Sequence, residues 1–200
     1  DGVLDHDDLC RETPQGPFPD PARRGCPLPD RDRDTVPDPQ DRCPDRPGIP
    51  SSDPRRNGCP DEHVTISDGV INILQPVYFA TDRDVILPRS EPVLRAVAHV
   101  LTAAPYIRRV RIEGHTDDAN TEAYNLDLSN RRANNVMLWL TQHGIEAARL
   151  EARGFGESRP IRAVDGLTGN ALRDARQLNR RVMFVIVDPA PPSGSSTPAR

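Results

Sequence analysis

The sequence has no lysine, only two methionines and one tryptophan, and aromatic residues make up 4% of its 200 residues. No run of about 18 or more apolar residues occurs, so no segment is suited to form a transmembrane helix. The sequence lacks Gly-x-Ser-x-Gly and His-Glu-x-x-His motifs, and every cysteine precedes residue 60, which argues against a hydrolase. The net charge of −4 disfavours a nucleic-acid partner, because such binding depends on neutralising phosphates. These absences favour a non-catalytic protein.

The composition divides the chain into parts. Residues 1–62 hold 13 of the 22 prolines and all four cysteines, with 15 acidic residues against 9 arginines. A segment with so few large apolar residues cannot bury enough surface to offset the entropy of ordering its chain, so it needs covalent or metal cross-links. Residues 63–188 have enough aliphatic residues for one core of modest domain size. Residues 189–200, rich in proline, serine and glycine, are predicted to be a disordered tail.

The first part contains an internal repeat with an offset of 33 residues. The Asp-x-Cys of residues 8–10 recurs at residues 41–43, and the Gly-Cys-Pro of residues 25–27 recurs at residues 58–60. An even number of cysteines in a weakly hydrophobic segment favours disulfides formed in an oxidising compartment. Four cysteines allow three pairings. The preferred one joins the cysteines within each unit, Cys10 with Cys26 and Cys43 with Cys59.

Carboxylates crowd one end of each unit. In the second unit they are Asp30, Asp32, Asp34, Asp38 and Asp41, and in the first they are Asp1, Asp5 and Asp8. Carboxylates at alternate positions of a tight loop converge on one point and repel one another unless a cation is present, and such hard oxygen ligands suit calcium. Zinc is disfavoured, because the cysteines lack the short spacing of structural zinc sites. The predicted cofactor is calcium, and a solvated acidic linker is the alternative.

The repeat resembles thrombospondin type-3 repeats, aspartate-rich calcium-binding units that often precede cell-envelope domains. The resemblance implies a calcium-stiffened spacer over residues 1–62. Two features depart from the pattern, because Thr35 stands where the first unit has Gly2, and Arg31 and Arg33 fill the gaps between aspartates.

Residues 63–188 alternate between strand and helix patterns. Apolar and alternating runs predict strands over residues 64–66, 70–74, 77–79, 108–113, 149–155 and 181–187. Apolar residues at the helical period predict helices over residues 88–104, 124–142 and 171–177. The order β-α-β-α-β-(α)-β predicts an α/β fold of the α+β sandwich type, with helices on one face of a mixed sheet. The irregular cross-linked repeats precede it.

Two charged residues stand out in this region. Asp117 lies in the Gly-His-Thr-Asp-Asp loop after a strand that should be central, where α/β sheets place ligands. Arg132 lies in line with an apolar stripe on the following helix, so both side chains can face one cleft. Asp117 can receive an ammonium group, and Arg132 can hold a carboxylate through two hydrogen bonds. The pair suits the zwitterionic end of an amino acid; alternatively, the two residues form a structural ion pair with each other.

The motifs resemble those of the OmpA C-terminal-like family of peptidoglycan-binding domains, which includes Pal lipoproteins and flagellar stator proteins. The resemblance covers about residues 77–186 and rests on "GHTDD", "YNLDLSNRRANNVMLWL", "RGFGESRPI" and "NRRVMFVI". It implies that Asp117 and Arg132 hold the amino and carboxylate groups of meso-diaminopimelate in the stem peptide. It also implies that other residues line or shape the pocket, namely Phe79, Thr116, Asn125, Leu128 and Arg181.

Two departures from the family pattern bear on this site. Many members have a glycine soon after the aspartate, whereas Asp118 adds a second carboxylate that can compete for the ammonium group. Residues 163–177 also differ from the usual sequence before the last motif and can alter the rim of the pocket.

The sequence therefore predicts a non-enzymatic protein of the bacterial periplasm, attached to the outer membrane. Its expected partner is peptidoglycan, so that it would tether the outer membrane or an envelope complex to the cell wall. The alternative is an assembly module whose pocket no longer binds the wall. The start at Asp1 shows no signal-peptide pattern, which favours an excised mature fragment with an upstream anchor such as a barrel, a lipid or another domain. A homodimer is left open.

Overall fold

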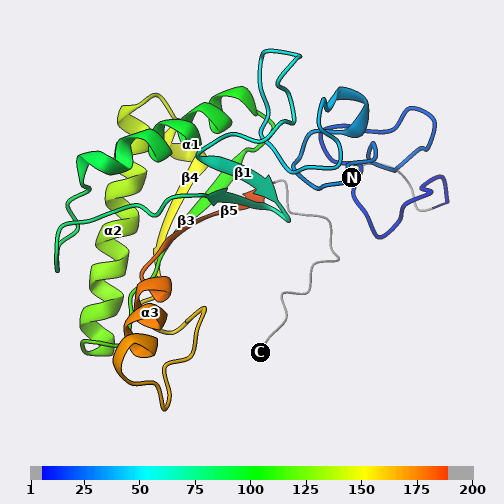
Figure 1. Cartoon of the computed structure of the whole chain (residues 1–200). Coiled ribbons are helices and arrows are strands. Elements are labelled where there is room, and N and C mark those ends of the chain that lie inside the picture. The colour runs from blue at the N-terminus through cyan, green and yellow to red at the C-terminus, as the bar shows by residue number, and fades with distance from the viewer. Residues whose placement is uncertain (1–5, 189–200) are drawn as a thin grey trace.

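The computed structural model describes residues 6–188, so the predicted tail and the candidate ligands Asp1 and Asp5 lie outside the described residues. Figure 1 shows an irregular N-terminal segment beside a domain of helices and strands. In chain order the elements are η1 (Asp38–Gln40), β1 (Val64–Ser67), β2 (Val70–Ile73), η2 (Pro88–Ser90), α1 (Glu91–Ala103), β3 (Arg109–Gly114), α2 (Glu122–Gln142), η3 (Ala147–Arg149), β4 (Leu150–Gly154), α3 (Gly169–Asn179) and β5 (Val182–Asp188). Within the described residues no helix is long and apolar enough to cross a membrane.

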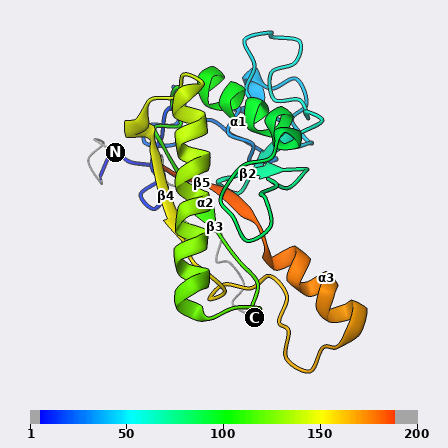
Figure 2. The same ribbon diagram turned by 90° about the vertical axis from the view of Figure 1, so that its left-hand side faces the viewer.

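The five strands form one mixed sheet, as predicted, and their order in it is β1-β2-β5-β3-β4. The β3–β4 pair is parallel, and the other neighbours are antiparallel. Helices α1 and α2 cover one face of the sheet, whereas α3 lies beyond the N-terminal start of β5 (Figures 1 and 2). The core lies between these two helices and the sheet, because their apolar stripes face it. Its fully buried members include Leu94, Val97, Leu101, Val110, Ile112, Ala133, Val136, Leu140 and Phe184.

Residues 77–79 do not form a strand of the sheet, so this part of the prediction is wrong. An isolated bridge joins Phe79 to Ile86. The Ala80 amide donates to the Val85 carbonyl at 2.9 Å, so the segment pairs with the residues that follow it along the chain. Local pairing satisfies its backbone groups without a place in the sheet. Phe79 remains partly buried against the core.

The structure confirms the repeat and its cross-links. The disulfides join cysteines within each unit, as preferred from the sequence: Cys10–Cys26 and Cys43–Cys59. Equivalent hydrogen bonds recur 33 residues apart, because Asp8 accepts from the Cys10 amide at 2.7 Å and Asp41 accepts from the Cys43 amide at 2.6 Å. The two units therefore share one local structure.

The glycine of each Gly-Cys-Pro motif is required by this structure. Gly25 and Gly58 have φ angles of 83° and 73°, which favour glycine. A Cβ atom would also lie 2.0 Å from an Asp8 oxygen at Gly25 and 1.9 Å from an Asp41 oxygen at Gly58. Each glycine thus makes room for the aspartate that caps the cysteine loop.

The repeats contact the domain directly. Ile49 is buried in the core of the domain, and the Ile66 amide of β1 donates to the Gly48 carbonyl at 2.8 Å. Tyr106 donates to the Thr35 carbonyl at 3.2 Å, and its ring meets Phe18 edge-on at a centroid distance of 4.8 Å. These contacts cross the boundary predicted after residue 62, so the second unit is docked on the domain rather than separate from it.

Candidate functional site

The loop that follows β3 is held in place by backbone hydrogen bonds and by the start of α2. The Thr116 amide donates to the Gly156 carbonyl at 2.9 Å, and Asn125 donates to the Asp117 carbonyl at 3.0 Å. A Cβ atom at Gly114 would lie 2.3 Å from the Ser129 carbonyl oxygen, so the glycine lets α2 pass close to the end of β3. This close approach brings the Asp117 loop beside the helix that carries Arg132.

Asp117 is buried and forms an ion pair with Arg180, not with Arg132. Its other carboxylate oxygen accepts a hydrogen bond from the Ala119 amide at 3.2 Å. The sequence left a mutual Asp117–Arg132 ion pair as an alternative, and the structure does not contain it. Arg180 follows directly after α3 and was not among the residues singled out from the sequence.

Arg132 is only partly satisfied by the protein. Its Nε–H donates to the Arg83 carbonyl at 3.0 Å, and its guanidinium lies 5.0 Å from the centre of the Phe79 ring. Burial lowers the pKa of Arg132, with the Arg180 charge acting in the same direction and nearby Asp117 opposing it. Within residues 6–188 its two terminal NH₂ groups have no hydrogen-bonding or ion-pair partner. The guanidinium is therefore half-buried and forms no ion pair in the described part of the chain, although the Asp82 charge and, more weakly, the Asp117 charge act on it.

The other predicted pocket residues divide into two groups. Asn125 and Leu128 are buried on α2, and Thr116 is buried with a hydroxyl that has no hydrogen-bond partner in the described part of the chain. Arg181 points elsewhere, because its guanidinium donates to the Asn179 carbonyl at 3.3 Å and to the Arg159 carbonyl at 3.0 Å. Of two adjacent arginines, only Arg180 reaches Asp117.

Asp118 has an arginine of its own. Arg176 of α3 donates to its two oxygens at 2.8 and 2.9 Å, and this pairing lowers the pKa of Asp118. The carboxylate that was expected to compete for a ligand's ammonium group is therefore engaged. Arg176 and Arg180 lie four residues apart, a spacing that places both on one side of a helix and its end. That spacing is the sequence signal by which they could have been found.

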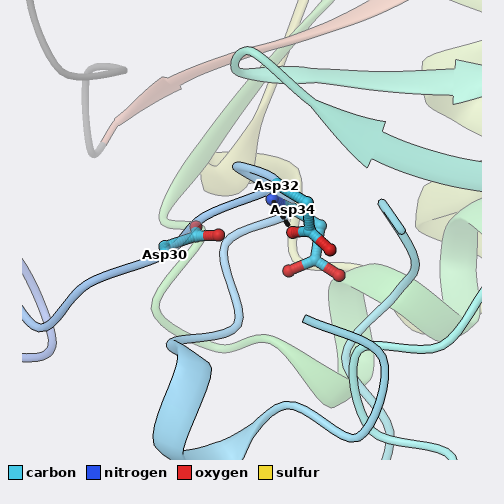
Figure 3. Close-up of side chains that lie close together, drawn as sticks. All are labelled: Asp30, Asp32 and Asp34. Atoms are coloured by element: carbon cyan, nitrogen blue, oxygen red, sulfur yellow. Dashed lines mark hydrogen bonds between the residues drawn. The ribbon is translucent and has the colours of Figure 1, made fainter. Parts of the chain in front are cut away.

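A second candidate site lies in the loop that joins the two repeat units. Figure 3 shows Asp30, Asp32 and Asp34 on this loop, and one oxygen from each lies within 4.8 Å of the others. Asp34 is fully buried and accepts from the Val36 amide at 2.8 Å and the Gly48 amide at 2.9 Å. The loop is thus built around its carboxylates.

These carboxylates have no arginine partner among the described residues. One oxygen each of Asp32 and Asp41 is buried without a hydrogen bond there. Burial raises the pKa of Asp30 to about 6 and that of Asp34 to about 7, and the Asp32 charge adds to both. Of the other predicted ligands, Asp38 pairs with Arg31 at 3.4 Å, and Asp8 is not part of this cluster. Three carboxylates therefore converge, and the Asp41 charge acts on Asp34 from nearby.

The domain is similar in sequence to several known proteins. Residues 78–173 match the model of the OmpA family. The outer-membrane lipoprotein YfiB of Pseudomonas aeruginosa is 38% identical over 110 residues, which cover 55% of this chain and 61% of the lipoprotein. The peptidoglycan-binding protein ArfA of Mycobacterium tuberculosis is 33% identical over 56% of this chain and 32% of its own length. Residues 78–173 therefore resemble the OmpA family.

A solved structure agrees. The cell wall anchor of the T6SS from Pseudomonas aeruginosa is 26% identical, with a TM-score of 0.50, and the match covers 62% of this chain and 87% of that structure. The chain spans less than two thirds of the length of either curated relative. The resemblance therefore concerns the domain and leaves the repeats aside.

Proposed function

We propose that the domain binds peptidoglycan through the diaminopimelate of the stem peptide and so tethers an envelope structure to the cell wall. The observation that carries this proposal is the guanidinium of Arg132, which forms no ion pair among the described residues yet lies within electrostatic range of the buried carboxylate of Asp117. A buried or half-buried charge is costly unless a partner neutralises it, so the site favours a ligand that brings a carboxylate. The same ligand can bring an ammonium group to Asp117.

Asp117 and Arg132 together suit the end of a stem-peptide diaminopimelate, which carries an ammonium group and a carboxylate on one carbon. Arginine binds a carboxylate through two parallel hydrogen bonds, and the free NH₂ groups of Arg132 suit this geometry. A relative named as peptidoglycan-binding and a structure named as a cell wall anchor support the same ligand. A place in the periplasm, attached to the outer membrane, fits the lipoprotein relative.

Cosedimentation with purified peptidoglycan sacculi tests the proposal. Arg132→Gln and Asp117→Asn should each weaken binding about tenfold or more, because each leaves the opposite charge of the ligand without a partner in a partly desolvated site. Arg131→Gln is the matched control, since Arg131 is the adjacent residue and pairs instead with Asp127 and Asp84. Equal retention of all four proteins would contradict the proposal and favour an assembly module.

The diaminopimelate specificity has its own test. Sacculi with lysine in place of diaminopimelate lack the second carboxylate, so wild-type protein should bind them less tightly than sacculi with meso-diaminopimelate. Arg132→Gln should remove most of this difference, since Arg132 is the residue assigned to that carboxylate. Equal binding of wild type to both sacculi would contradict a diaminopimelate clamp while leaving wall binding in place.

We also propose that the repeats form a calcium-binding spacer of the thrombospondin type-3 kind. The buried, unpartnered oxygens of Asp32 and Asp41 beside the Asp30 and Asp34 carboxylates support it. A divalent cation bound by oxygen ligands would neutralise this repulsion. The spacer would set how far the wall-binding domain reaches from its anchor.

Calorimetric titration with calcium chloride tests the spacer. Asp32→Asn should abolish or strongly weaken calcium binding, whereas Asp53→Asn should not, because Asp53 caps the Arg55 amide in the same unit and lies outside the cluster. Calcium should also raise the unfolding temperature of wild type and EDTA should lower it, since a ligand that binds only the folded state stabilises it. Unfolding that is unmoved by calcium or EDTA would contradict the spacer.

A further inference from the structure

Arg180 forms an ion pair with Asp117, the carboxylate that the ammonium group of the proposed ligand would need. It lies at the end of α3 and forms its ion pair with Asp117 from the exposed side of the loop. The Arg180 side chain is 45% exposed, whereas that of Asp117 is 11% exposed. Because Arg180 keeps much of its contact with water, it can leave the ion pair at small cost. Asp117 cannot, because it would remain buried without a cation.

The position of Arg180 is set by the structure around it. Helix α3 buries only Ala175 and Asn179, so apolar packing contributes little to its placement. Polar contacts hold it instead, because Arg176 grips Asp118 with two hydrogen bonds. The Asn179 side chain accepts from the amides of Ile161 and Arg162 at 2.9 and 3.0 Å. These contacts keep the end of α3, and Arg180 with it, over the Asp117 loop.

We propose that Arg180 is an internal counter-ion that neutralises Asp117 in the free protein and is displaced by the ammonium group of the ligand. This inference rests on the proposed function, because it assigns the same carboxylate to the ligand. On binding, one ion pair of Asp117 is exchanged for another, while Arg132 gains a carboxylate it did not have. Arg180 therefore lowers the affinity of the site and selects against ligands that carry no ammonium group to replace it.

The alternative is that Arg180 belongs permanently to the binding site, where it orients Asp117 or contacts the ligand itself. The two cases predict opposite effects of its removal. A displaced counter-ion competes with the ligand, so its loss tightens binding. A positioning or contacting residue assists the ligand, so its loss weakens binding.

The experiment is calorimetric titration of the full chain with a muropeptide that contains meso-diaminopimelate, at several concentrations of sodium chloride. Arg180→Gln should bind about two- to fivefold more tightly than wild type, the range expected for loss of a partly exposed ion pair. Its binding should also weaken more steeply with salt, because the variant forms an ion pair with the ligand where wild type only exchanges one. Arg173→Gln, the same charge change on the exposed face of α3, should match wild type.

Weaker or unchanged binding by Arg180→Gln, with wild type binding and Asp117→Asn impaired, would overturn the inference and leave the proposed function intact. Failure of wild type to bind would instead remove the proposed function and the inference with it. Circular dichroism verifies that the variants fold. If Arg180→Gln does not fold, Arg180→Met, which keeps the apolar stem, replaces it in the same comparison.

Discussion

The repeats and the C-terminal domain differ in how their carboxylates are neutralised. In the domain, Asp117 and Asp118 each have an arginine from the end of α3. In the repeats, Asp30, Asp32 and Asp34 converge without any such partner among the described residues. Arginines of the domain neutralise Asp117 and Asp118, whereas Asp30, Asp32 and Asp34 have no such partner among residues 6–188, which is why we propose that they bind calcium. Added calcium should therefore change the stability of the repeats and leave that of the domain unchanged.

The two regions also differ in what holds them together. The domain has a contiguous apolar core between two helices and a sheet. The repeats bury few apolar side chains and rely on disulfides and on hydrogen bonds from backbone amides to aspartates. A short segment with a small core commonly needs such cross-links, because burial alone does not offset its conformational entropy. The following predictions would break or sharpen this comparison.

Loss of a disulfide should give the largest effect. Replacing Cys43 and Cys59 with serine should destabilise the second unit by about 2–4 kcal/mol, while the sheet of the domain persists. Hydrogen exchange measured by NMR should show faster exchange in residues 34–62 and little change in β3 and β5. The matching Cys10→Ser/Cys26→Ser variant should affect the first unit and spare the contacts of Ile49. Collapse of the whole domain in either variant would contradict two separately held regions.

Without calcium, the stability of the two regions should respond to pH with opposite signs. Burial raises the pKa values of Asp30 to about 6 and Asp34 to about 7, above the ordinary 3.8. Between about pH 4 and 7 the folded repeats therefore bind more protons than the unfolded chain, and their stability falls as pH rises. The two pKa rises correspond to at most about 7 kcal/mol, which solvent screening of the partly exposed carboxylates reduces, and calcium should abolish the change.

The stability of the domain should instead rise with pH. Burial lowers the pKa of His115 below the ordinary 6.5. Burial raises that of Glu113, but the nearby His115 side chain and the hydrogen bond from Arg111 outweigh it and lower the pKa below 4.5. The unfolded chain then binds more protons, so the domain loses stability as pH falls below about 6.5. Hydrogen exchange in EDTA from pH 4.5 to 7.5 measures both regions, and parallel slopes would contradict the prediction.

The junction between the regions should give a smaller effect. Tyr106→Phe removes hydrogen bonds to Thr35 and should destabilise the docked second unit by about 1 kcal/mol. Tyr78→Phe is the control, because the Tyr78 ring packs on Arg89 and the residue is bonded to Ser90 through its backbone amide, which the substitution leaves in place. Thermal unfolding with calcium present measures the difference. An equal effect of both substitutions would show that the Tyr106 hydroxyl does not hold the junction.

Asp118→Asn should have the smallest effect on stability, because both partners of its ion pair are about one third exposed. NMR shifts of residues 169–180 should nevertheless change, since Arg176 loses its charged partner. If Arg180 acts as an internal counter-ion, the looser end of α3 should also tighten muropeptide binding slightly. Unchanged shifts in α3 would show that Asn179 alone places the helix.

Much of the fold follows from local pattern. The helical period of residues 91–103 and 122–142, and the alternation in the strands, depend on neighbours within a few residues, so periodicity predicted them. The 33-residue offset revealed the repeat and favoured the pairing of cysteines within each unit. Residues 77–79 were wrongly predicted as a strand of the sheet, because an apolar run does not indicate which segment it will pair with. Its pairing with residues 85–87 depends on the turn between them.

The sequence was sufficient to single out Asp117, Arg132 and the aspartates of the repeats, because their types and spacings carry chemistry. Only the tertiary structure could decide their partners. Asp117 meets Arg180 across 63 residues and Asp118 meets Arg176 across 58, whereas Arg132 stays without a carboxylate. Charge pairing depends on where distant elements come together in space, and opposite charges are too common in this chain for composition to choose among them. Residue type and spacing therefore selected the candidate residues, and packing determined which of them have a partner within the protein.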